Sequence, residues 1–114
     1  MPVIRDAARP RDKAHRMAVA PAETLAATRT ITTAEIDRYQ AFAFDPGGAG
    51  RDVNLPPEAR SKGAFIYIAN TADAAEILTI KEDGGTTICT PTQAETAVLW
   101  CDGTTWFGHV GANS

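Results

Sequence analysis

Apolar and polar residues alternate along most of the chain after Leu25, and a period of two is typical of β-strands. Between residues 39 and 44 the alternation places Phe42 and Phe44 on one face. In residues 51–55 it turns Val53 and Leu55 inward. Strands are predicted over residues 28–33, 39–44, 51–55, 64–69, 76–81, 86–90, 96–101 and 104–110.

Turns rich in Gly, Pro and Asp separate these segments. Residues 45–50 (DPGGAG) are predicted to form a loop, and Glu82–Gly85 a hairpin turn. Asp102-Gly103 accepts positive φ at both central positions, which predicts a tight type I′ turn. About eight short strands with turn signals roughly every 8 to 12 residues are typical of a small antiparallel β-sandwich or barrel. The predicted fold class is therefore all-β.

Helical structure is expected only at two short places. Thr33 is a possible cap for a turn or a short helical start. Residues 58–62 have room for one helical turn between Pro57 and Gly63. The segment 64–69 (AFIYIA) is apolar on both faces, which predicts a strand that is covered on two sides. The predicted core comprises Ile31, Phe42, Phe44, Val53, Leu55, Phe65, Ile66, Ile68, Leu78, Ile80, Ile88, Val98, Trp100 and Trp106.

The first 25 residues differ from the rest of the chain in their pattern of apolar and polar residues. Pro2, Pro10 and Pro21 interrupt any helix, and Ala and Arg are interleaved without an apolar stripe. Such a segment cannot bury enough apolar surface to order itself. We expect an extended N-terminal arm over residues 1–25 and a β-domain over residues 26–114.

The length of 114 residues fits one domain, and its net charge of −3 is unevenly distributed. Residues 1–25 carry five basic and three acidic groups (+2), whereas residues 26–114 carry six basic and eleven acidic groups (−5). An acidic body argues against nucleic acid as the main partner. The basic arm has two open interpretations, which are contact with an acidic surface and a solvated tail. No apolar run has the length of a membrane span or the pattern of a signal peptide.

Residues for catalysis are sparse, and the sequence predicts no enzyme and no cofactor. A serine hydrolase needs a nucleophile within reach of an imidazole. The only serines are Ser61 and Ser114, and the only histidines are His15 and His109. Cys101 and His109 could meet across the last hairpin, but no third group is evident that would orient them.

The two cysteines, Cys89 and Cys101, are interpreted mainly as buried apolar residues, with a disulfide between neighbouring strands as an alternative. Together with His109 they offer the right atom types for zinc. Their spacing matches no metal motif, so no metal site is predicted.

Four aromatic side chains, Tyr67, Trp100, Trp106 and Phe107, allow two interpretations. Rings exposed in a row could stack on sugars, as in a carbohydrate-binding module. Trp100 and Trp106 lie near each other across the Asp-Gly hairpin, however, and this favours packing in a core or in a subunit interface.

Residues 40–110 resemble a small β module found in structural proteins of tailed bacteriophages. The resemblance lies in a strand ending in Leu55-Pro56, a strand from Gly63 to Asn70, a strand from Ile77 to a Gly84 turn, and Cys101-Asp-Gly-Thr-x-Trp106. It implies a virion component that is often oligomeric, with a trimer favoured. Similar motifs also occur in tail-fibre and spike segments.

A short chain without fibrous repeats favours a capsid decoration (cement) protein, which binds the outside of a phage head and stabilises the lattice of the major capsid protein. A tail-fibre, spike or receptor-binding module is the alternative. The implied location is the capsid surface of a virion that assembles in the bacterial cytoplasm, with neither nucleic acid nor membrane as partner. Within the arm, we expect capsid contacts from Val3, Ile4, Arg5, Arg9, Arg11, Met17 and Val19.

Overall fold

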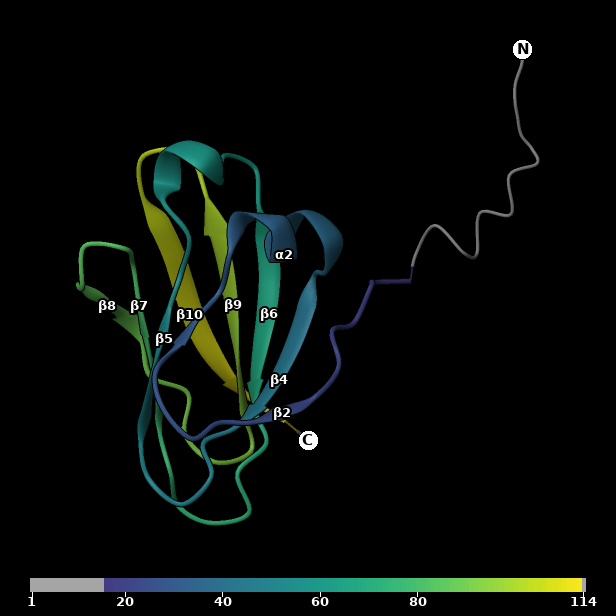
Figure 1. Cartoon of the computed structure of the whole chain (residues 1–114), viewed down its shortest axis with the longest axis vertical. Coiled ribbons are helices and arrows are strands. Elements are labelled where there is room, and N and C mark those ends of the chain that lie inside the picture. The colour runs from purple at the N-terminus through teal and green to yellow at the C-terminus, as the bar shows by residue number, and fades with distance from the viewer. Residues whose placement is uncertain (1–15, 114) are drawn as a thin grey trace.

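The structure is a computed structural model, and it describes residues 16–113 of the chain (Figure 1). These residues form mostly β-structure in two sheets that enclose one apolar core. The elements are β2 (Glu23–Thr24), β3 (Arg29–Thr30), α2 (Thr33–Arg38), β4 (Ala41–Asp45), β5 (Arg51–Asn54), η1 (Glu58–Arg60), β6 (Phe65–Asn70), β7 (Leu78–Lys81), β8 (Thr87–Cys89), β9 (Glu95–Cys101) and β10 (Trp106–Ala112).

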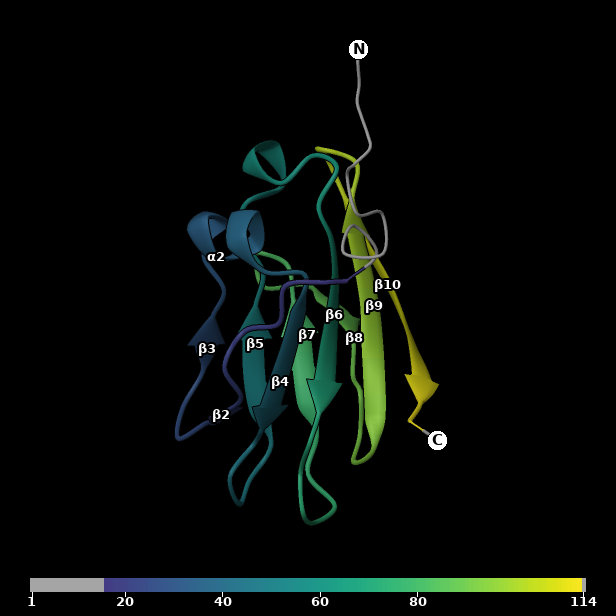
Figure 2. The same cartoon turned by 90° about the vertical axis from the view of Figure 1, so that its right-hand side faces the viewer.

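Both sheets are mixed, so the prediction of a purely antiparallel sandwich or barrel is wrong in this respect. One sheet has the strand order β10-β9-β6-β4-β2 and the other β3-β5-β7-β8. From β2 to β7 the chain changes sheet at every strand, and successive strands of one sheet therefore run parallel. Only the β6–β9, β9–β10 and β7–β8 pairs are antiparallel. In Figure 2, β10 lies at the opposite margin of the strands from β3 and α2.

The core confirms most of the predicted inward positions, with errors concentrated on β6 and β9. Of the predicted set, Ile88 and Val98 are only partly buried, and Phe65 and Trp100 are exposed. The segment 64–69 is thus covered on one side only. The buried positions that the sequence did not identify are Ala20, Leu25, Ile36, Ala97 and Leu99. Cys101 is buried, as expected of it, whereas Cys89 is only partly buried.

The β9–β10 connection is a four-residue loop rather than a type I′ turn. The register pairs Cys101 with Trp106, and of the loop residues only Gly103 has a positive φ, +98°. The Asp102 carboxylate accepts hydrogen bonds from the backbone N–H groups of Thr104 and Thr105, at 2.9 and 2.8 Å. This side chain therefore organises the loop as an Asx turn, which removes the need for a second positive φ.

Residues 18–25 belong to the five-stranded sheet, although the expected arm extends to residue 25. Val19 forms a parallel bridge with Ala41, and the N–H groups of Ala20 and Leu25 donate to the carbonyls of Ala41 and Asp45. Ala20 and Leu25 are buried. The paired structure therefore begins before the domain boundary that the composition indicates.

A charged cluster joins this segment to β3 and α2. The Arg29 guanidinium donates to Glu23 at 3.0 and 2.8 Å and to Glu35 at 2.9 and 2.6 Å. Helix α2 is capped by Thr32, one residue before the expected Thr33, in a reciprocal capping box with Glu35. Glu35 thus serves both the helix cap and the ion pair.

Candidate docking surface

Three aromatic side chains form one exposed row across the outer side of the five-stranded sheet. Antiparallel register places Phe65 of β6 opposite Trp100 of β9, and Trp100 opposite Phe107 of β10. Their exposed fractions are 50%, 48% and 40%. We call Phe65, Trp100 and Phe107 the aromatic row.

The rings of the row are packed on neighbouring rings of the same face. Trp100 and Phe107 stack with centroids 4.7 Å apart and an angle of 28° between their planes. The ring centroids of Phe65 and Tyr67 lie 5.4 Å apart, with an angle of 47° between the ring planes. Contacts of this kind fix the orientation of the rings before any partner binds.

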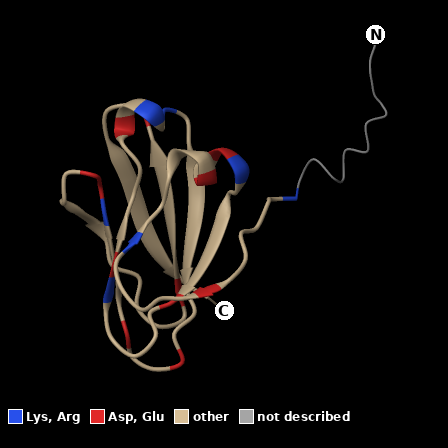
Figure 3. Ribbon diagram, viewed as in Figure 1, with Lys and Arg blue, Asp and Glu red and all other residues tan. Residues whose placement is uncertain are grey.

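A second row lies beside the first. Its members, which lie at paired positions on neighbouring strands, are Val19, Ala41, Tyr67, Val98 and His109. Neither row contains Lys, Arg, Asp or Glu. Figure 3 shows that charged residues are placed mainly in the loops and the other elements, while β6, β9 and β10 are almost free of them. We call the two rows together the outer face.

The sequence of β9 explains why these rings face outward. In residues 95–101 (ETAVLWC), the side chains on both faces of the strand are apolar from Ala97 on. Alternation alone therefore does not identify the face that is buried. In the structure Ala97, Leu99 and Cys101 are buried, which turns Val98 and Trp100 to the other side. Trp106 is buried and donates its indole N–H to the Pro56 carbonyl at 2.9 Å.

Two of the expected arm contacts lie within the described residues. Met17 and Val19 are both exposed, and Val19 is part of the outer face. The remaining expected contacts, Val3, Ile4, Arg5, Arg9 and Arg11, lie outside the described residues.

The structure does not bring together the residues weighed for catalysis or zinc binding. Cys101 is buried, whereas His109 is exposed on the outer face. Both cysteines are free thiols. Burial raises the pKa of Cys89 to about 11 and also raises that of Cys101, which keeps both in the unreactive thiol form. The Ser61 hydroxyl is buried and donates to the Pro57 carbonyl at 2.7 Å.

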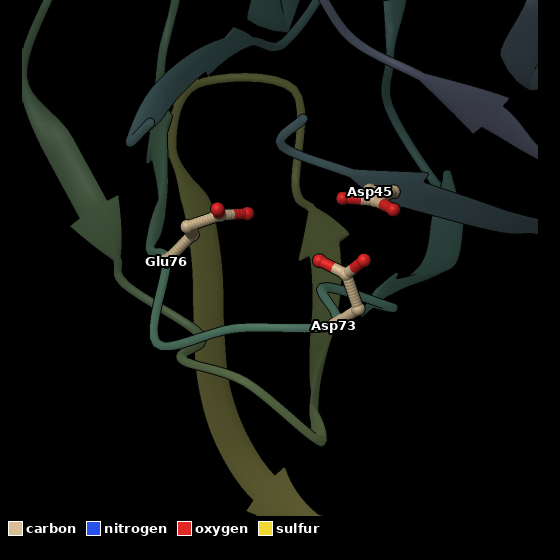
Figure 4. A group of neighbouring side chains, drawn as sticks. All are labelled: Asp45, Asp73 and Glu76. Atoms are coloured by element: carbon tan, nitrogen blue, oxygen red, sulfur yellow. The ribbon is translucent and has the colours of Figure 1, made fainter. Parts of the chain in front are cut away.

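Three carboxylates gather at the end of β4 opposite to α2, a feature that sequence reasoning missed. Asp45, Asp73 and Glu76 bring one oxygen each to within 4.8 Å of one another (Figure 4). The Oε1 atom of Glu76 is buried and has no hydrogen-bond partner among the described residues. Oxygen ligands of this type suit Ca²⁺ or Mg²⁺. No spacing signal reveals the group, because Asp45 ends β4, whereas Asp73 and Glu76 lie in the connection between β6 and β7.

Comparisons of the chain with protein-family models, with curated proteins and with solved structures found no match. Among the described residues, no helix combines the length and the apolar character needed to cross a membrane.

Proposed function

We propose that this protein is a structural module that docks on a larger protein assembly through its outer face, as a decoration protein on the major capsid protein of a phage head. The observation that carries the proposal is the exposed aromatic row beside a second row of side chains, both without Lys, Arg, Asp or Glu. A few central residues, among which Trp and Tyr are enriched, carry most of the binding energy of a protein interface. The resemblance of residues 40–110 to virion modules supports the capsid as the partner.

The arrangement of the rings favours a protein partner. Trp100 presents one ring face to Phe107, so that face is unavailable to a ligand. The outer face also has few hydrogen-bonding side chains, with Tyr67 and His109 as its main polar members. A sugar site needs several polar groups that converge beside an open ring. A broad apolar protein surface requires neither.

The position of Val19 connects the arm to this surface. Val19 lies on the outer face, and Met17 is exposed two residues before it. The described part of the chain therefore begins three residues before a member of the outer face. Capsid contacts from the arm and from the outer face would then reinforce each other, because one bound contact raises the effective concentration of the next.

The test is binding of the purified protein to phage heads assembled from the proposed partner, the major capsid protein. Trp100→Ser is expected to weaken binding by about 30-fold, the effect of losing one interface anchor worth about 2 kcal/mol. Ile77→Ser is the matched control, because Ile77 is similarly exposed but lies outside the outer face. Equal binding by the two variants would refute the assignment of the surface.

A second candidate is a receptor-binding module that recognises carbohydrate, and the exposed row of rings is the observation in its favour. Trp100 is exposed and Trp106 is buried, so ligand-induced changes in tryptophan fluorescence would report mainly on Trp100. A shift on adding host-surface glycans, together with failure to bind heads, would favour this candidate over capsid decoration.

A further inference from the structure

Two turns of the chain contain an aspartate followed by a glycine. Asp83-Gly84 lies in the turn between β7 and β8, and Asp102-Gly103 lies in the loop between β9 and β10. At such a pair the backbone nitrogen of the glycine can attack the carboxyl carbon of the aspartate, because glycine has no Cβ that obstructs the approach. The reaction requires a free N–H group and a carboxyl group that can move toward it. The two pairs differ in both respects.

The reacting groups of the Asp102-Gly103 pair are occupied. The Asp102 carboxylate accepts hydrogen bonds from the backbone N–H groups of Thr104 and Thr105, at 2.9 and 2.8 Å, and these bonds lower its pKa. The N–H of Gly103 donates to Cys101 Sγ at 3.4 Å. An attack of the Gly103 nitrogen on Asp102 would require these hydrogen bonds to be given up. The lowered pKa also keeps the carboxyl group in its charged, less reactive form.

The turn that contains Asp83-Gly84 is held by neighbouring residues instead. The N–H of Glu82 donates to the Thr86 carbonyl at 2.9 Å, and the N–H of Gly85 donates to the Glu82 carbonyl at 3.0 Å. The N–H of Thr86 donates to Glu82 Oε1 at 2.9 Å. Asp83 is exposed, and the N–H of Gly84 has no hydrogen-bond partner among the residues that the structure describes. Asp83 and Gly84 can therefore react without loss of the hydrogen bonds that hold the turn.

Two further carboxyl groups lie beside Asp83. Glu58 of η1, Glu82 and Asp83 each bring one oxygen to within 4.8 Å of one another. Repulsion between charges at this separation favours retention of a proton in the group. A hydrogen bond from the backbone of Glu58 lowers the pKa of its carboxyl group, but desolvation, a hydrogen bond with Asp83 and the nearby charges raise it above the ordinary value. A proton is thus held next to the carboxyl group from which the reaction must remove OH as water.

We propose that Asp83 forms isoaspartate spontaneously in the folded protein, whereas Asp102 keeps its normal linkage. In the first step the Gly84 nitrogen bonds to Asp83 Cγ. The N–H proton of Gly84 and the OH of the protonated Asp83 carboxyl group leave together as one water, and a cyclic succinimide remains. In the second step water adds to one of the two ring carbonyls, and the bond from that carbon to nitrogen breaks.

The position of this second cleavage determines the product. Cleavage at Cγ restores aspartate, whereas cleavage at the α-carbonyl carbon leaves the nitrogen on Cγ as an isoaspartyl linkage. One water is released and one is consumed, so no other reactant is required. The isoaspartyl linkage carries the main chain through the side chain of Asp83 and lengthens the turn between β7 and β8 by one methylene group.

The modified residue also presents a new chemical group to other proteins. Its carboxylate is attached to Cα and lies at an exposed position of the chain. Enzymes that methylate isoaspartyl carboxylates therefore have access to it, and the aged protein becomes a substrate of that class. This chemistry is independent of the proposed docking on a capsid.

The first experiment ages the full-length protein in mildly acidic buffer below its unfolding temperature. Methyl transfer by an isoaspartyl methyltransferase measures total isoaspartate, and electron-transfer fragmentation of the digested peptides assigns each position. Isoaspartate is expected to accumulate at least about tenfold faster at Asp83 than at Asp102, which corresponds to a barrier difference of about 1.4 kcal/mol. The control is the chain unfolded in urea, where the two Asp-Gly pairs should react at similar rates.

Two variants test the assigned roles. Gly84→Ala is expected to suppress the reaction at Asp83, because a Cβ obstructs the attacking nitrogen. The turn should tolerate this change, since Gly84 does not have a positive φ and the atom nearest to the Cβ position is the flexible end of Glu82, at 2.8 Å. Glu58→Gln removes an ionisable neighbour of Asp83 and is expected to slow the reaction by about threefold or more in the folded protein, but not in urea.

Three results would overturn the proposal. They are the absence of isoaspartate at Asp83 in the folded protein, an equal or faster rate at Asp102, and a folded Gly84→Ala variant that isomerises as fast as the wild type. An unchanged rate in Glu58→Gln would refute the part assigned to the neighbouring carboxyl groups. Failure of the protein to bind phage heads would instead count only against the proposed function.

Discussion

The contact between Gly47 and Leu25 gives a sharp test of how the first residues of the sheet are held. Gly47 has a φ of +78°, and a Cβ built there would lie 2.3 Å from the Leu25 carbonyl oxygen. That oxygen cannot simply move away, because the Leu25 N–H donates to Asp45 at 2.7 Å and the Leu25 side chain is buried. Gly47→Ala is therefore expected to displace the chain at Leu25 from β4.

The expected loss has two separable parts. A non-glycine residue at positive φ costs about 1 to 2 kcal/mol. Displacing Leu25 adds a lost hydrogen bond of about 1 kcal/mol and part of the roughly 1.5 to 3 kcal/mol that burial of a leucine provides. Gly48→Ala isolates the first part, because Gly48 has a φ of +104° but no atom within 4 Å of the Cβ position. We expect a loss of about 3 to 4 kcal/mol for Gly47→Ala and about 1 to 2 kcal/mol for Gly48→Ala.

Urea unfolding at neutral pH, followed by the fluorescence of the buried Trp106, measures both losses on one scale. Hydrogen exchange adds a local readout. In the Gly47→Ala variant, the amides of Ala20 and Leu25 should lose protection before those of the central strands, since both donate to β4. Equal losses of stability in the two variants would show that the close approach to Leu25 contributes nothing.

The sequence predicts where strands lie better than it predicts how they pair. Alternation and turn residues place β4, β5, β7 and β9 close to their observed ranges. They carry no information on which sheet receives the next strand. From β2 to β7 the chain crosses between sheets each time, and the parallel neighbours follow from these crossings. A connection of a few residues can either cross to the other sheet or form a hairpin within one sheet. The lengths of the connections therefore do not reveal the parallel pairs, and the prediction of a purely antiparallel topology is wrong.

The sequence predicts the docking surface only in part, since it leaves core and subunit-interface packing open for Trp100 and Phe107. From Ala97 to Cys101 the residues on both faces of the strand are apolar, and the prediction places Val98 and Trp100, which together are bulkier than Ala97 and Leu99, in the core. A large apolar side chain is buried only where the residues opposite it leave enough space. The structure instead buries Ala97 and Leu99, and Leu99 lies close to Gly108, where a Cβ would approach its side chain to 2.7 Å. The glycine opposite Leu99 was the available signal, because it provides the space that a buried leucine needs.

Two further predictions concern carboxylates that single variants can test. Glu76→Gln is expected to raise the free energy of unfolding by about 1 kcal/mol when measured in EDTA. The substitution removes one negative charge from the group with Asp45 and Asp73, and it adds an amide N–H donor at the buried end of the side chain. A lower thermal midpoint would contradict this. The Arg29 hydrogen bonds, opposed by desolvation and assisted by Thr32, lower the pKa of Glu35 to about 2 from 4.5. The stabilisation is therefore complete above about pH 4.5 and is lost as the pH falls toward 2. Because Glu35 is partly exposed, solvent screening reduces the expected advantage of wild type over Glu35→Gln to about 1 to 2 kcal/mol at pH 7. The two unfolding free energies should converge below pH 4.5, and a constant difference down to pH 2 would show that the ion pair with Arg29 contributes no stability.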